Sequence, residues 1–482
     1  MAHDDGISID EAFQQVGVGY GSCLLLFITG MLFCADAAEL GFIAYAIQPL
    51  EHRWGLHASE VVFLEQAVLS GQILGPLFWG RLADRHGRRP AILACAGVVL
   101  VCGLLTAAAQ NYWQLVIVQA GVGFGVSGVF LCMDILCELL PKEGCGPFCN
   151  ALQFFWPFGG MFLLFAAWAT LDFFGWRGLT VCAAIPISAA FVLAIGFLPE
   201  SPHWLLEQGR NAEARAALEY LAALNGVKVS FGKLADAEQT PRSEHRDQAE
   251  AGRASWTGHL GKLCSLTAVW FLMDAVYMSS LLLGPVVFVK PVADDAEPGE
   301  QTPALDFLPL SLSSGSELVS VILGLLLLDR LGRRKFQFIL YLVAGAAALG
   351  VSFRELPYAG LVAAVVTTRC ATFAASCGTW VHTPELFPVE IRGTAHAVCS
   401  VSKNLGSLMG PVLVSQFVSP GLCGLTMSTA AVAAGILALQ LPETRKLMPE
   451  LYDPSGYLPL GSRPLANVPE TSINSLRETL KV

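Results

Sequence analysis

The stretch GRLADRHGRR occupies residues 80–89, and its second part, DRHGRR, returns as DRLGRR at residues 329–334, 245 residues further along the chain. Two other pairs keep nearly the same offset: Glu138 with Glu385, each three residues before a proline, at 247, and the Pro-Glu dipeptides at 199–200 and 442–443, at 243. Three pairs within four residues of one offset indicate that the chain consists of two similar halves.

Apolar runs of about 20 residues surround these motifs, and such a run crosses the hydrocarbon core of a bilayer, about 30 Å thick, as one helix. Of the 482 residues, 54% are hydrophobic and 14% are charged, against about 25% charged in an ordinary soluble domain. We therefore expect an all-α membrane protein with twelve transmembrane helices, at approximately 22–49, 60–79, 90–109, 112–136, 148–171, 178–198, 264–289, 307–328, 336–353, 358–381, 394–418 and 421–441.

The repeat offset spans six of these runs, so the two halves have the same orientation and form parallel repeats about an axis along the membrane normal. In the polar segment before the first run, Ser8 and Glu11 have the spacing of a helix-starting capping box. We expect five regions: an N-terminal segment (1–21), a six-helix bundle (22–202), a central loop with a helical stretch at 211–224 (203–262), a second six-helix bundle (263–445) and a tail (446–482).

The distribution of Lys and Arg predicts the orientation. With a cytoplasmic N-terminus, the short inner loops hold ten of these residues and the outer loops four, so we expect both chain ends in the cytoplasm. The membrane itself is either the plasma membrane or that of an intracellular vesicle. Most of the fourteen cysteines lie inside the apolar runs without a Cys-x-x-Cys pair, so we expect them to pack rather than to bind metal.

Ionisable residues inside the apolar runs are the first candidates for a functional site. A charge at mid-bilayer costs at least about 2.5 kcal/mol, so it normally faces a cavity or a partner. Most of the candidates fall near the middle of their runs, the depth at which transporters place their binding sites. For substrate binding or coupling we select Asp36, Glu39, Asp274, Glu317 and Arg369.

Each of these charges also has a purely structural interpretation. Asp36 or Glu317 would neutralise Arg369 in an ion pair, Asp274 would bond to groups of its own bundle, and Glu39 would only line the outer mouth. Four acids against one base make the expected cavity acidic. This balance favours an organic cation or a neutral solute moved with protons.

Aromatic residues on the same helices would complete a pocket by stacking or by cation–π contact. The alternative is that they serve as packing residues or interfacial anchors. The candidates are Phe155, Trp156, Trp270, Tyr277 and Trp380.

Three stretches resemble signatures of the major facilitator superfamily, in its sugar-porter and organic-ion branch: residues 80–89, PESPHWL at 199–205 and TPELFPVEIRG at 383–393. SIDEAFQQVGVG at 8–19 and ADAAE at 35–39 are similar to the group of synaptic vesicle glycoprotein 2 and its related protein. The resemblance covers nearly the whole chain and implies the major facilitator fold, with alternating access between two six-helix bundles.

The resemblance also implies an ionic latch at the cytoplasmic ends of the helices, while the alternative for its arginines is topology signalling by positive charge. Two positions depart from the family pattern: Gln119 replaces an arginine common in helix four, and Cys145-Gly146 replaces Arg-Gly. The expected gating residues are Asp84, Arg85, Arg88, Glu138 and Glu200 in the first half, and Asp329, Arg330, Arg333, Glu385 and Arg392 in the second.

From these features we expect a secondary active or facilitative transporter of a small organic solute, an organic ion with a cation favoured, with or without coupled protons. A neutral sugar transporter and a non-transporting receptor or trafficking protein on a transporter scaffold are the alternatives. The sequence has no phosphate loop, nucleophile elbow or metal-ligand spacing. We therefore expect no enzyme activity, cofactor, metal site or nucleic-acid partner, and a monomer embedded in the lipid bilayer.

Overall fold

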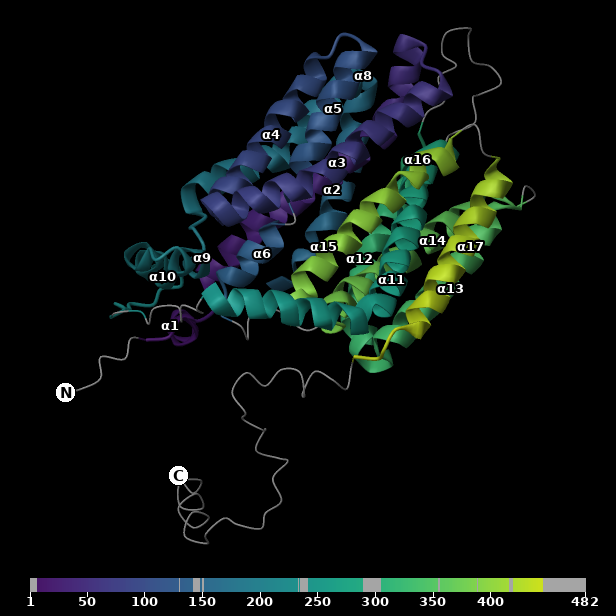
Figure 1. Cartoon of the computed structure of the whole chain (residues 1–482). Coiled ribbons are helices and arrows are strands. Elements are labelled where there is room, and N and C mark those ends of the chain that lie inside the picture. Colours follow the sequence, from purple (N-terminus) through teal and green to yellow (C-terminus); the bar gives the residue numbers. More distant parts are fainter. Residues whose placement is uncertain are drawn as a thin grey trace, which may run out of the picture.

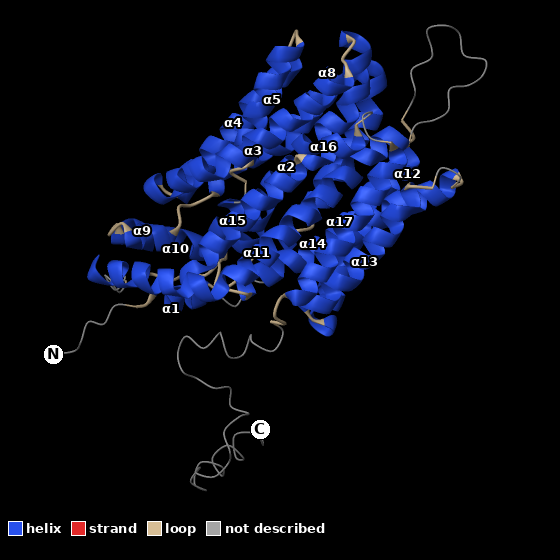
Figure 2. Cartoon of the chain, turned by 45° about the vertical axis from the view of Figure 1, so that its right-hand side comes forward, coloured by secondary structure: helices blue, strands red, loops and turns tan. Residues whose placement is uncertain are grey.

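The computed structural model describes residues 7–129, 131–141, 148–149, 151–232, 234, 242–288, 305–353, 356–387, 389–415 and 419–444, with only the backbone described at 242–258, 389–394 and 420. The described elements are helices (Figures 1 and 2). They are α1 (Ile9–Val16), α2 (Tyr20–Trp54), α3 (Ala58–His86), α4 (Arg88–Ala108), α5 (Tyr112–Val126), α6 (Leu131–Glu138), α8 (Phe155–Phe197), α9 (Pro202–Glu207), α10 (Asn211–Leu224), α11 (Arg242–Val287), α12 (Phe307–Leu331), α13 (Arg333–Val351), α14 (Tyr358–Glu385), α15 (Val389–Ser407), α16 (Met409–Val414) and α17 (Pro420–Gln440).

Eleven helical stretches in the described part of the chain are long and apolar enough to cross a membrane. One of them, α8, has a non-helical backbone at Gly175, where φ is 63°, so it consists of two spans joined at a bend. The described part of the chain therefore contains twelve spans, and the predicted all-α membrane fold is confirmed. Large apolar side chains such as Phe173 (82% exposed) and Ile117 (70% exposed) lie on the surface, where lipid would cover them.

The spans form two bundles that meet along one seam. In Figure 1 the first half, purple to blue, lies at the upper left and the second, green to yellow, at the lower right. Within the first half α2 packs on α8 and α3 on α5, while in the second α11 packs on α15 and α13 on α17. Across the seam α8 contacts α12, α2 contacts α11, and α3 contacts α15 and α16. We refer to this boundary as the seam.

Two side-chain amides bond across the seam at different depths. Nδ2 of Asn404 on α15 donates to the carbonyl oxygen of Gln72 on α3 at 3.0 Å. Nε2 of Gln48 on α2 donates to the carbonyl oxygen of Pro285 on α11 at 3.4 Å. The two halves are therefore joined by few direct polar contacts, which suits surfaces that must separate.

The elements outside the bundles agree with the sequence in part. The capping box is confirmed, because the Glu11 amide donates to Ser8 Oγ (3.3 Å) and the Ser8 amide to Glu11 Oε2 (3.1 Å). The helical stretch expected at 211–224 is α10. The expected bundle boundary at residue 263, in contrast, falls inside α11, which is continuous from residue 242. The run at 394–418 contains two helices, α15 and α16.

The repeated motif forms the same network in both halves. In the first half, Arg88 pairs with Asp84 at 2.6 Å and with Glu138 at 3.3 Å. Glu200 Oε1 accepts from the backbone amides of Arg88 (2.8 Å) and Arg89 (3.1 Å). Three helix ends and the segment after α8 are thereby tied together.

In the second half, Arg333 pairs with Asp329 at 2.8 Å and binds both carboxylate oxygens of Glu385 at 2.9 Å. The backbone amide of Arg333 donates to Glu443 at 2.8 Å. The corresponding first-half pair is weaker, because Glu138 accepts through one oxygen and its Oε2 has no partner among the described residues. In the described residues, each network lies within its own half.

Three further gating candidates are Arg85, Arg330 and Arg392. Arg85 and Arg330 are exposed. The side chain of Arg392 and the dipeptide at 145–146 lie outside the described residues.

A glycine at the centre of each motif has a positive φ, 107° at Gly87 and 83° at Gly332. A Cβ at Gly87 would lie 2.2 Å from Glu200 Oε2, and one at Gly332 would lie 2.8 Å from Glu443 Oε2. Each turn therefore requires its glycine for two reasons: the positive φ of the backbone and the close approach of the carboxylate.

We predict that Gly87→Ala destabilises the protein, because this positive-φ backbone costs a residue with a Cβ on the order of 1–3 kcal/mol and the Glu200 carboxylate must move. Thermal denaturation in detergent, followed by tryptophan fluorescence, would show a lower melting temperature. Gly80→Ala is the matched control, since nothing lies within 4 Å of a Cβ there. Equal melting temperatures for the two variants would contradict the prediction.

Candidate functional site

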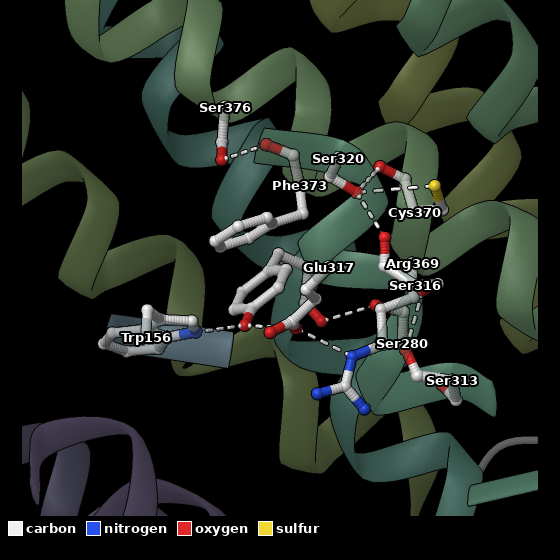
Figure 3. Close-up of polar contacts among 11 residues, drawn as sticks. Trp156, Ser280, Ser313, Ser316, Glu317, Ser320, Arg369, Cys370, Phe373 and Ser376 are labelled. Carbon is white, nitrogen blue, oxygen red and sulfur yellow. Dashed lines mark hydrogen bonds and ion pairs between the residues drawn. The ribbon is translucent and has the colours of Figure 1, made fainter. Parts of the chain in front are cut away.

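A chain of hydrogen bonds crosses the seam at its centre (Figure 3). Nε1 of Trp156 on α8 donates to the Tyr277 hydroxyl on α11 at 2.7 Å. That hydroxyl donates to Glu317 Oε1 on α12 at 2.8 Å. The same oxygen accepts from Nε of Arg369 on α14 at 2.8 Å. Four of the candidate residues, from four helices and both halves, are thus brought together.

The Glu317–Arg369 ion pair is almost completely buried, with exposures of 1% and 4%. Glu317, rather than Asp36, is therefore the partner of the mid-membrane arginine. An isolated charge in this place would be strongly unfavourable. Each residue needs the other, and Tyr277 satisfies a further lone pair of the carboxylate.

A small cavity of about 20 Å³ lies beside this chain. Both halves line it, because Gly41 and Tyr45 of α2 and Trp156 of α8 face Glu317 and Arg369. Its volume admits about one water molecule, so the seam is nearly closed at this depth. Solute binding here would require the halves to separate slightly.

Arg369 retains bonding capacity toward the cavity. Figure 3 shows its two terminal nitrogens pointing away from Glu317, and among the described residues only Nε donates, to Glu317. A guanidinium can donate five hydrogen bonds. The ion pair and a ligand role are therefore compatible for this residue.

Asp36 and Asp274 gather around a third charge, Lys403 of α15. Lys403 interacts electrostatically with both carboxylates, although it makes no ion pair within 4 Å among the described residues. Asp274 is 3% exposed and accepts a hydrogen bond from the Ser407 hydroxyl. Asp36 Oδ1 is buried and has no partner in the described part of the chain. Because Asp36 belongs to the first half, this cluster also spans the seam.

The other candidates lie elsewhere. Glu39 is buried against α4, where a Cβ at Gly103 would lie 3.0 Å from its Oε1. Phe155 packs edge-on against Phe27 of α2, with ring centroids 6.3 Å apart. Trp270 is 0% exposed, donates to Thr383 Oγ1 at 3.0 Å and meets Trp380 at 4.6 Å between centroids. The last two tryptophans form a cluster inside the second half, as the packing alternative described.

Gln119 occupies the position of the missing arginine and is fully buried. Its Nε2 donates to Thr106 Oγ1 at 3.1 Å, and its Oε1 has no partner among the described residues. Gln119 therefore brings no positive charge to this position of the first half.

Lys403 and Glu65, one half-buried and one buried, are absent from the candidates chosen from the sequence. Lys403 lies inside the run at 394–418 and Glu65 inside the run at 60–79, so both meet the criterion that selected the other five. The signal was present, and the same count of in-run charges would have found them.

A family model described as "Sugar (and other) transporter" matches residues 22–454. Among characterised sequences, the synaptic vesicle 2-related protein of Xenopus laevis is 26% identical over 455 residues, covering 91% of this chain and 81% of that protein. The organic cation/carnitine transporter 7 of Arabidopsis thaliana is 25% identical over 439 residues, covering 84% of this chain and 87% of the relative.

Solved structures show the same fold. The partially occluded inward-open form of the xylose transporter XylE from E. coli matches with a TM-score of 0.68 at 20% identity, covering 88% of this chain and 98% of XylE. The resemblance to the major facilitator superfamily and to the synaptic vesicle 2-related proteins is thereby confirmed.

We predict that Arg369→Ala lowers the stability of the protein, because it leaves Glu317 as a buried unpaired carboxylate, a loss of typically about 3–5 kcal/mol. Arg369→Lys should retain the fold, since a positive charge remains. Thermal denaturation measures both, with Arg210→Ala as the control, because the Arg210–Glu213 pair on α10 is exposed. A melting temperature for Arg369→Ala equal to that of the control would contradict the structural role of the pair.

Proposed function

The chain belongs to the family of sugar and other transporters, and we propose that it carries a small organic ion, with cations favoured, by alternating access of the seam cavity. As a member of this family it is an integral membrane transporter of small solutes and not an enzyme. The observation that carries the proposal is the cavity beside Glu317 and Arg369, because residues of both halves line it. A solute held there would be released to either side as the halves rock.

The charges at the seam support an ionic substrate. Three acids, Asp36, Asp274 and Glu317, stand against two bases, Arg369 and Lys403. A cationic group would reduce the excess negative charge, and Trp156 and Tyr45 offer aromatic faces beside it. The Arabidopsis relative is named as an organic cation/carnitine transporter, which is consistent with this substrate class.

Uptake into proteoliposomes tests the proposal. Organic ions that raise the melting temperature of the purified protein would be tested as radiolabelled solutes, beside neutral sugars of similar size. We expect saturable uptake of at least one organic cation that empty liposomes lack. Saturable uptake of sugars alone would favour the sugar alternative, and binding without uptake would favour a receptor.

We propose that protons are coupled through Asp36, which lies at the seam. The charged and titratable groups around it are Glu39 on its own helix, Lys403 on α15 and Cys132 on α6. A proton taken up from outside would neutralise the Asp36 carboxylate, and Lys403 would then interact with the remaining charge of Asp274. In this proposal the protein acts as a monomer with both chain ends in the cytoplasm.

If Asp36 accepts the coupled proton, uptake should rise as the external pH falls, since a larger fraction of the carrier is then protonated. Asp36→Asn should remove this pH dependence while solute exchange persists. Glu39→Gln is the comparison, because Glu39 faces α4 instead of the seam. Superimposable pH profiles for the wild type and both variants would exclude the two residues as proton carriers.

We also propose that the two motif networks act as gates at the cytoplasmic ends of the halves. Their bonds lie within each half, so their role would be to keep these ends rigid when the halves close against each other. Labelling of a single cysteine at the cytoplasmic mouth should increase in Asp84→Ala, Arg88→Ala, Asp329→Ala and Arg333→Ala. Labelling equal to that of Arg210→Ala in all four would leave only a topological role.

A further inference from the structure

A second pocket, of about 160 Å³, lies at the N-terminal end of α3. Asp84 lies near the C-terminal end of the same helix, so the pocket and the Asp84 network are at opposite ends of the bundle. Like the central cavity it belongs to both halves, and the two share Ala44 in their walls. We call it the vestibule pocket. Its lining includes Gln48 and Glu51 of α2, Val62 and Glu65 of α3, Pro285 of α11, and Ser415 beyond α16.

Glu65 is the unusual group in this pocket. Its side chain is only 9% exposed, it lines the pocket, and among the described residues it makes no hydrogen bond and no ion pair. Glu51 lines the same pocket and interacts with it electrostatically. No Lys, Arg or His is among the described residues that line the pocket. A buried carboxylate without a partner is unfavourable, so a cation bound in this pocket would be stabilised by Glu65.

The rest of the wall defines what kind of cation would be accepted. Side chains such as Ile47, Val61 and Leu282 give the pocket apolar walls. Gln48 donates through Nε2 to Pro285, which leaves its carbonyl oxygen free to accept a hydrogen bond. An ammonium group supplies N–H donors for the carboxylate and this oxygen, and a short alkyl body matches the apolar walls and the volume.

We propose that the vestibule pocket binds a small alkylammonium ion, with Glu65 as its principal carboxylate partner and Glu51 as the second. Because Ala44 is shared with the central cavity, a cation bound here is one step from Glu317 and Arg369. The pocket would collect cations before the seam opens. The inference shares its cation preference with the proposed function, but it concerns a separate site and binding rather than transport.

The test is calorimetric binding to the full-length protein in lipid nanodiscs, with n-butylammonium as the probe and 1-butanol as its uncharged analogue. The wild type should bind the ammonium ion and not the alcohol. Glu65→Gln should weaken that binding component at least about tenfold, since it removes a charge-assisted hydrogen bond. Any binding of butylammonium at the central cavity should persist in this variant.

The control is Glu60→Gln, five residues earlier on α3, whose carboxylate accepts from the His57 amide at 2.8 Å outside the pocket. It removes the same charge and should leave binding unchanged. Val62→Trp keeps Glu65 but fills the pocket, so it should also lose the binding of butylammonium there. This variant provides the test if Glu65→Gln fails to fold.

Equal affinity for butylammonium and butanol would overturn the proposal, as would equal losses in the Glu60 and Glu65 variants. Unchanged binding in Val62→Trp would place the cation elsewhere. Because no readout involves uptake, failure of transport would leave this result standing, and the reverse also holds.

Discussion

A buried ion pair between Glu317 and Arg369 is the constraint on which the centre of the protein depends. Neither charge is stable alone in the membrane, so α12 and α14 must stay in register at this depth. Tyr277 adds α11, and the bond from Trp156 carries the same chain of contacts into the first half. This chain of hydrogen bonds thus both stabilises the second bundle and closes the seam. Within it, only the bond from Trp156 to Tyr277 crosses between the halves.

The cytoplasmic ends follow a different rule, since their networks are nearly complete within each half. A carboxylate after the sixth helix of each half binds the backbone amides that follow a glycine turn, and an arginine joins two further acids. Such networks can hold each bundle rigid while the seam, with few polar contacts, changes. Rigid halves and a weakly bonded seam are the mechanical requirement of alternating access.

The apolar runs predicted the twelve spans, and the repeat offset predicted which acids correspond in the two motif networks. Both predictions depend on patterns that are visible in the sequence itself. The position of a residue in a run predicted depth but not the direction in which its side chain points. Trp156 and Trp270 both lie inside apolar runs, yet one faces the seam and the other packs against Trp380. Partners are also non-local: only the fold brings Lys403 near both Asp36 and Asp274, or leaves Glu65 without a base among the described residues that line its pocket.

The central claim is that solute binds at the seam cavity between the two halves. The most direct measurement is a structure of the protein in lipid nanodiscs with a transported solute bound. The account predicts the solute in contact with Trp156 or Tyr45 of the first half and with Glu317 or Arg369 of the second, in a cavity wider than the present one. A solute held by residues of one half alone, with the chain from Trp156 to Arg369 unchanged, would contradict it.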